Sequence, residues 1–87
     1  EGLGLYRLGH GKQWLLDGGP DHQHVNRSGG MITGNPLMLG GMARVAEAVL
    51  QLRGEAGARQ VPGAKRAVAQ GATGPAGQCQ TVVVLEN

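Results

Sequence analysis

The chain has 87 residues, of which 17 are glycine and only two, Tyr6 and Trp14, are aromatic. A chain of this length buries only roughly 60% of the surface that its unfolded form exposes, so it holds at most one small domain with a marginal core. The net charge is +2, and the basic residues are spread along the sequence with no aromatic residues interleaved among them. This pattern argues against a nucleic-acid-binding surface.

Cysteine use and hydropathy bear on the compartment. Cys79 is the single cysteine, so no internal disulfide can form, and no apolar run is long enough to cross a membrane. We therefore expect no membrane span and a reducing, cytoplasmic location.

The first third of the chain is rich in turn-forming residues. Glu1–Leu8 begins without an initiator Met and alternates Gly with Leu, as if the sequence entered in the middle of an element, so we expect a fragment of a longer protein. Gly, Asp, His and Asn dominate from Gly9 to Gly34, which predicts a long loop. The apolar patch Trp14-Leu15-Leu16 inside that loop is expected to pack against a neighbour.

A long apolar helix is predicted after this loop. Asn35 suits an N-cap, and Pro36 suits the first turn because it lacks the N–H that would be unpaired there. Gly54 stands where a helix commonly ends in a left-handed residue. Apolar residues cover most of the circumference, which predicts a helix covered on nearly every side: Leu37, Leu39, Met42, Ala43, Val45, Ala46, Val49, Leu50 and Leu52.

Two features interrupt this apolar surface. Arg44, Glu47 and Gln51 form a narrow polar strip at helical spacing. Gly40 and Gly41 each cost about 1 kcal/mol relative to Ala in a helix, so we expect another backbone or a ligand to approach closely there.

Two strands are predicted at the C-terminus. After a Pro-containing turn at Arg59–Gly63, Ala64–Gln70 and Gln80–Glu86 read as strands joined by the segment GATGPAG. The last run is continuously apolar, which predicts burial on both faces of the hairpin. One helix cannot cover both faces, so the remaining cover must come from residues outside this chain or from a partner.

Two short motifs carry little weight. His22 and His24 beside Asp21 could supply metal ligands only if another ligand approached, and loop histidines at this spacing usually face solvent, so no metal is expected. In Gly9-His10-Gly11-Lys12 the lysine is followed by Gln13, and the glycine spacing of a phosphate-binding loop is missing.

Several pieces in sequence order carry a family resemblance. They are Leu3-Gly4-Leu5, Asp17-Gly18-Gly19, Asn26-x-Ser28-Gly29-Gly30, Gly34-Asn35-Pro36, Leu52–Ala64 and the final strand pair. Together they resemble the C-terminal half of thiolases, in particular the sterol-carrier and lipid-transfer type. The resemblance implies an α/β fold over residues 1–87: a partial thiolase-like C-terminal half with a long loop, one buried helix and a C-terminal strand pair, incomplete as a domain.

The resemblance also locates the chemistry. Thiolases form or cleave a carbon–carbon bond next to a coenzyme A thioester, and the histidine of their Gly-His-Pro element helps to activate a nucleophilic cysteine from the N-terminal half. Asn35 stands at that histidine position and cannot accept the proton. Its amide could donate a hydrogen bond to a thioester oxygen, or it could serve only as a helix cap.

A second family signature, Cys-x-Gly, follows the first strand of the C-terminal hairpin. This chain reads Gln70-Gly71-Ala72-Thr73-Gly74 there, so a thiol is missing, although Gly71 or Gly74 could keep a backbone donor for an oxyanion. Gly34 and Gly71 are thus the expected substrate contacts. Cys79 lies beyond the loop and is predicted to be a packing residue rather than the catalytic cysteine.

Three readings of function follow from the resemblance. The chain is the C-terminal part of a thiolase-like acyl-CoA acyltransferase whose catalytic His and second Cys are replaced, or a non-catalytic lipid-transfer or assembly subunit that forms one wall of an acyl-CoA cleft. A third reading is a truncated frame without independent function. The implied partners are an acyl-CoA, as substrate rather than cofactor, and either further copies of the chain or a complementary thiolase N-terminal half. The isolated chain is expected to be inactive.

Overall fold

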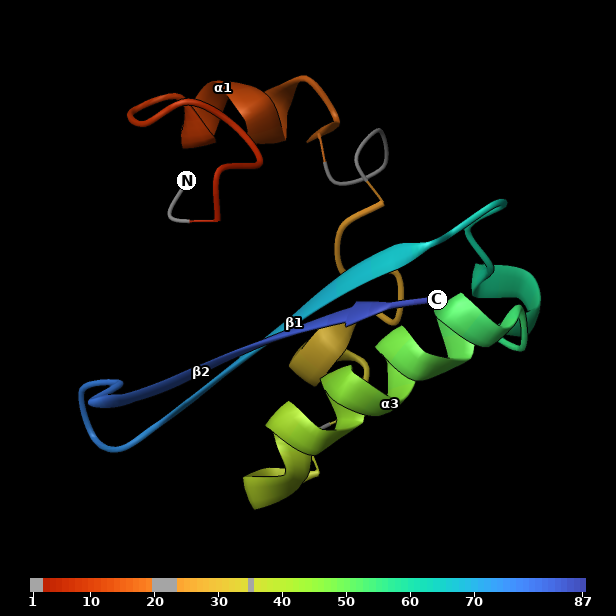
Figure 1. The fold of residues 1–87 in the computed structure, drawn as a ribbon. Coiled ribbons are helices and arrows are strands. Elements are labelled where there is room, and N and C mark those ends of the chain that lie inside the picture. The colour runs from red at the N-terminus through yellow and green to blue at the C-terminus, as the bar shows by residue number, and fades with distance from the viewer. Residues whose placement is uncertain (1–2, 20–23, 35) are drawn as a thin grey trace.

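The computed structural model describes residues 3–19, 24–34 and 36–87 (Figure 1). Its helices and strands are α1 (Gly11–Leu16), α3 (Gly40–Arg53), β1 (Arg66–Thr73) and β2 (Cys79–Glu86), with 3₁₀ turns at Gly30–Ile32, Leu37–Leu39 and Gly57–Arg59. The architecture is that of a small α/β fragment in which α3 packs on a two-stranded antiparallel sheet. No helix within the described residues is long and apolar enough to cross a membrane.

Helix α1 forms inside the segment that was predicted to be loop. The ring of Trp14 stacks on Tyr6, with centroids 4.5 Å apart, and Gly19 lies so close to the indole that a Cβ there would collide with it. Trp14 therefore packs within its own segment, while Leu15 and Leu16 remain exposed. Figure 1 shows α1 standing apart from α3 and the hairpin.

The start of the long helix differs from the prediction, whereas its end agrees with it. Pro36 precedes a 3₁₀ turn rather than the α-helix, which begins at Gly40. Leu37 has a φ of 54°, a left-handed value that an α-helix cannot contain. The predicted cap, Asn35, lies outside the described residues. Gly54 is left-handed, with a φ of 76°, and its N–H donates to the Gln51 carbonyl, as expected for a residue that ends a helix.

The predicted hairpin is confirmed, but its first strand is longer than expected. The two strands pair from Arg66 with Glu86 to Thr73 with Cys79, so Gly71 belongs to β1 and not to the loop. The turn is therefore confined to the residues between the strands, where Gly74 and Gly77 have φ values of 92° and 63°.

The close approach predicted from the helix glycines occurs where α3 crosses β1. A Cβ on Gly41 would lie 3.8 Å from the Cα of Gly71, and a Cβ on Gly71 would lie 3.4 Å from the Cα of Gly41. Gly40 instead lies under Met31, whose sulfur would be 3.0 Å from a Cβ there. The buried apolar residues among those described are all small: Ala48, Ala56 and Ala69.

Among the residues that the structure describes, α3 covers one face of the hairpin. Helix α3 lies along that face, next to the buried Ala69 (Figure 1). On the opposite face Val82 and Val84 are 50% and 61% exposed. The expectation that one helix leaves part of the hairpin open is thus confirmed, and cover from outside the chain stays a prediction. The expectation that α3 itself is covered on nearly every side is wrong among the described residues, because Met42 is 69% exposed.

The crossing of α3 over β1 predicts how bulk at Gly41 is tolerated. Gly41→Ala should raise the free energy of unfolding by up to about 1 kcal/mol, because its methyl group only reaches van der Waals contact with Gly71 and alanine favours the helix. Gly41→Leu should lower it by about 1 to 3 kcal/mol, because the longer side chain must push β1 away. Far-UV circular dichroism during heating measures both, with the exposed Ala46→Leu as a control for added bulk. Equal melting of Gly41→Leu and the wild type would contradict the crossing.

The open face of the hairpin predicts self-association of the isolated chain. Replacing Val82 and Val84 together with Thr keeps β-branched side chains but makes the open face polar, so it should shift the chain toward monomer. Multi-angle light scattering over a concentration series measures this change, with Val83→Thr as the control on the neighbouring position of the same strand. A wild-type chain that is monomeric at every concentration and melts in one sharp transition would contradict the prediction.

Candidate functional site

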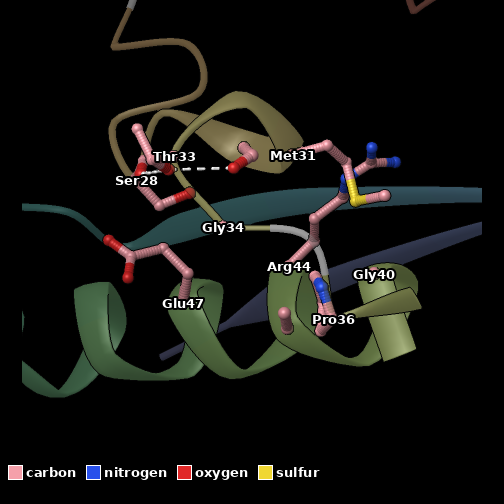
Figure 2. A pocket seen from close by; sticks show the side chains of 10 residues that line it. Ser28, Met31, Thr33, Gly34, Pro36, Gly40, Arg44 and Glu47 are labelled. Atoms are coloured by element: carbon pink, nitrogen blue, oxygen red, sulfur yellow. Dashed lines mark hydrogen bonds between the residues drawn. The ribbon is translucent and has the colours of Figure 1, made fainter. Parts of the chain in front are cut away.

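The predicted Asn-x-Ser-Gly-Gly turn is present and is held by hydrogen bonds. The N–H of Gly29 donates to the Asn26 carbonyl at 2.9 Å, and Gly29 and Gly30 have φ values of 81° and 64°. The hydroxyl of Thr33 lies within hydrogen-bonding distance of the Ser28 and Gly30 carbonyls, at 3.0 and 2.9 Å (Figure 2). Because left-handed glycines and a side-chain bond fix its shape, this loop forms a defined wall above α3.

A hollow of about 520 Å³ separates this loop from the first half of α3 (Figure 2). Small residues on both walls leave the space open. The lining residues from the loop side are Ser28, Gly30, Met31, Thr33, Gly34 and Pro36, and those from α3 are Gly40, Ala43, Arg44 and Glu47.

The predicted site residues fall in different places. Gly34 and Pro36, the neighbours of Asn35 in the sequence, both line this hollow, whereas Asn35 itself lies outside the described residues. Gly71 lies inside β1 and lines a second hollow of about 320 Å³, on another face of α3. The substrate contacts assigned to Gly34 and Gly71 stay predictions, and in this chain they belong to separate hollows.

Cys79 lies at the second hollow, as the first residue of β2. It was predicted to be a packing residue, but it is exposed. Its strand partner is Thr73, the last pair of the hairpin before the turn, and Thr73 is exposed as well.

The polar strip of α3 binds the segment that follows the helix. Gln51 is only 8% exposed, and its amide nitrogen donates to the Arg59 carbonyl at 2.9 Å and to Glu47 at 3.1 Å. Its amide oxygen accepts from the N–H of Val61 at 2.8 Å, and its own carbonyl accepts from the Gln60 side chain at 2.9 Å. Buried polar groups need such partners. The sequence indicates the strip but not these long-range bonds, for which the position of Gln51 between Leu50 and Leu52 is the only local signal.

Glu47 is paired with a cation outside the hollow. Arg59 donates to both of its carboxylate oxygens, at 3.2 and 2.8 Å. The hydrogen bond from Arg59 is the main reason that the pKa of Glu47 lies below its ordinary value, and Gln51 lowers that pKa further, while burial opposes the shift. Glu47 is therefore a carboxylate at neutral pH and holds no proton to donate.

Arg44 links α3 to β1. Its Nη1 donates to the Gln70 carbonyl at 2.6 Å and lies 3.5 Å from the Gln70 side-chain oxygen. Figure 2 shows the side chain rising from α3 beside Met31. Gln70, which the resemblance predicted to stand near the position of the second family thiol, is thus in contact with Arg44, one of the residues that line the first hollow.

The described residues give no structural support to the weak possibility of a histidine metal site. His24 is exposed, and Asp21 and His22 lie outside the described residues. Within the described ranges no three His, Cys, Asp or Glu side chains gather closely enough to hold a metal ion.

A helix with a glycine crossing on a hairpin, preceded by an Asn-x-Ser-Gly-Gly loop, defines a thiolase-like C-terminal segment. The family model of thiolase C-terminal domain-like proteins matches residues 1–87, and the chain belongs to this family.

Curated relatives agree with this assignment. The chain is 49% identical over 73 residues to human sterol carrier protein 2 (Homo sapiens), a match that covers 78% of the chain and 13% of that protein. It is 46% identical over 69 residues to the acetyl-CoA acetyltransferase of Methanothermobacter thermautotrophicus, covering 75% of the chain and 18% of that enzyme. The matches thus span less than a fifth of the length of either relative. No solved structure gives a significant match.

The ion pair between Glu47 and Arg59 predicts a pH dependence of stability. Because the pKa of Glu47 is lowered on folding, its contribution is complete above the ordinary value of 4.5 and is lost as the pH falls through the lower folded value. Glu47→Gln should therefore be less stable than the wild type at neutral pH, and the two should converge in acid. Thermal melts across this pH range measure the difference. Glu86→Gln, at the exposed pair with Arg66, is the control and should change little. A difference that is constant with pH would contradict the assignment.

Proposed function

We propose that this chain is the C-terminal part of a thiolase-like acyl-CoA acyltransferase and that it forms one wall of the thioester-binding cleft. Membership of the family supports the fold and the reaction class, and the acetyl-CoA acetyltransferase relative supports the choice of substrate. The single observation that carries the proposal is the hollow between the Ser28–Gly34 loop and α3.

The two residues that flank the family histidine position in the sequence line this hollow. Gly34 and Pro36 line it, so the residue between them is close to it along the chain. The first turns of α3 also border it, and the N-terminal end of a helix favours developing negative charge. A thioester carbonyl that becomes negatively charged during the reaction would be stabilised by such a wall. In this proposal Asn35 donates a hydrogen bond and takes no proton.

The lining favours binding and orientation over proton transfer. Among the described residues that line the hollow, none is His or Cys, and the carboxylate of Glu47 is held by Arg59. The hydroxyl of Thr33 is bonded to the loop backbone. Proton transfer and nucleophilic attack are therefore assigned to the N-terminal part of a full-length protein.

The same observation supports a second candidate from another class. A non-catalytic lipid-transfer or assembly subunit would use the hollow only to bind an acyl-CoA, and the sterol carrier protein 2 relatives fit that reading by their name. A reactive cysteine in the N-terminal part of the protein favours the acyltransferase, and its absence favours the binding subunit.

Restoring the family histidine tests the proposal. In a full-length protein with an N-terminal nucleophilic cysteine, Asn35→His should increase acyl-enzyme formation, since general-base assistance is worth about 10²- to 10⁴-fold. Rescue should be incomplete, because Gln70 still replaces the second thiol. Mass spectrometry of the acylated protein and calorimetric titration of acetoacetyl-CoA measure the two steps.

Asn35→Ala is the control, because it removes the amide without adding a base. Thermal stability is measured beside activity for both variants, so that a folding defect is not taken for a change in acylation. If Asn35→His changes neither acylation nor acyl-CoA affinity in a stably folded protein, position 35 does not face the thioester and the proposal fails.

A further inference from the structure

The charges of the first hollow do not balance. Two charged side chains line it, Arg44 and Glu47. The carboxylate of Glu47 is paired with Arg59, which does not line the hollow. For Arg44, no salt bridge to a carboxylate occurs within the part of the chain that the structure describes, and both of its hydrogen bonds go to the uncharged Gln70. The hollow therefore carries one positive charge without a matching negative charge from its described residues.

The guanidinium of Arg44 retains hydrogen-bonding capacity. A guanidinium has five N–H donors in a planar fork, and both described bonds of Arg44 start from Nη1. The side chain is half-buried, which removes part of its hydration and increases the benefit of an anionic partner. The bond to the Gln70 carbonyl also holds the group in place, so a ligand would lose less side-chain entropy on binding.

The surroundings of Arg44 leave room for a ligand group. Gly40 lies one turn before Arg44 on α3 and contributes no side chain to the hollow. Gly30 and Gly34 likewise contribute no side chain from the loop side. Figure 2 shows Met31 beside Arg44, where its flexible thioether closes one side of the hollow. A planar oxyanion can approach a fixed guanidinium here without displacing backbone.

We infer that Arg44 makes this hollow a binding site for an oxyanionic group of the ligand. The group is a carboxylate at the far end of the acyl chain, as in a dicarboxylic acyl-CoA, or a phosphate of coenzyme A. Either accepts two parallel hydrogen bonds from guanidinium. The inference rests on the proposed acyl-CoA function and adds a specificity determinant to it: Arg44 selects an anionic ligand, and Gln70 positions Arg44.

Calorimetric titration of the full-length protein tests the inference. The probes are succinyl-CoA, butyryl-CoA and the phosphate-free thioester butyryl-pantetheine, and the variants are Arg44→Met and Arg44→Lys. If Arg44 binds an acyl carboxylate, Arg44→Met should weaken succinyl-CoA by about 10- to 100-fold and leave butyryl-CoA unchanged. If it binds a phosphate, both CoA esters should weaken equally while butyryl-pantetheine stays the same. Arg44→Lys keeps the charge and should restore part of the loss.

Arg53→Met is the matched control. It removes the same charge from the same helix, but Arg53 is exposed and pairs with Glu55 away from the hollow, so all affinities should remain at wild-type values. If Arg44→Met does not fold, Arg44→Lys decides. It keeps the charge but cannot donate the two parallel hydrogen bonds of a guanidinium, so the ligand whose anion contacts Arg44 should still bind more weakly, and wild-type affinity for all three probes would overturn the inference.

Two results separate the failure of the inference from that of the proposed function. If the wild type binds butyryl-CoA and Arg44→Met leaves the affinity for every probe unchanged, the inference is overturned and the proposed function stands. The same holds if Arg44→Met weakens butyryl-pantetheine as much as the two CoA esters. Absence of binding for all three thioesters overturns both.

Discussion

The contact between Gly41 and Gly71 sets the geometry on which the other features depend. Because neither residue has a side chain, the backbone of α3 lies directly on β1. This contact fixes which helix residues face the strands and which face the loop. Arg44 contacts Gln70, and Glu47 and Gln51 contact the segment after the helix, while Met42 lines the second hollow together with strand residues. Bulk at the crossing would increase the separation of helix and strand and loosen the bond between Arg44 and Gln70.

A core of three alanines provides little hydrophobic stabilisation, so polar contacts specify much of the arrangement. The side chains of Gln51 and Gln60 bridge α3 and the connection to β1 through bonds to backbone groups, and Ala56, at the start of that connection, is 2% exposed. Buried polar networks of this kind fix one arrangement when every member has a partner. The open face of the hairpin leaves apolar surface at Val82 and Val84 uncovered by the described residues, so it adds little to this stabilisation.

The candidate site uses the same elements as the fold. The glycine turn and Thr33 hold the loop, α3 forms the opposite wall, and the bond that joins α3 to β1 also orients Arg44 at the hollow. The described side chains there are suited to binding and orientation, since the carboxylate is ion-paired and proton-accepting imidazole is missing from the described lining. These features agree with the proposed role of the segment as one wall of a thioester-binding cleft.

The sequence by itself determined the local elements and the family. Helical spacing and Gly54 predicted the body and end of α3, the valine run predicted β2, and the glycines predicted the close approach of another backbone, because each of these signals acts over a few residues. Only the tertiary structure decided that Gly71 belongs to a strand, that Cys79 is exposed and that Gln51 binds residues 59–61. The structure also showed that α3 begins at Gly40 and not at Pro36, because Leu37 has a left-handed φ. These outcomes depend on pairings between segments 8 to 30 residues apart, for example Arg44 with Gln70 and Gln51 with Arg59, and the energies of such contacts are not encoded in local periodicity.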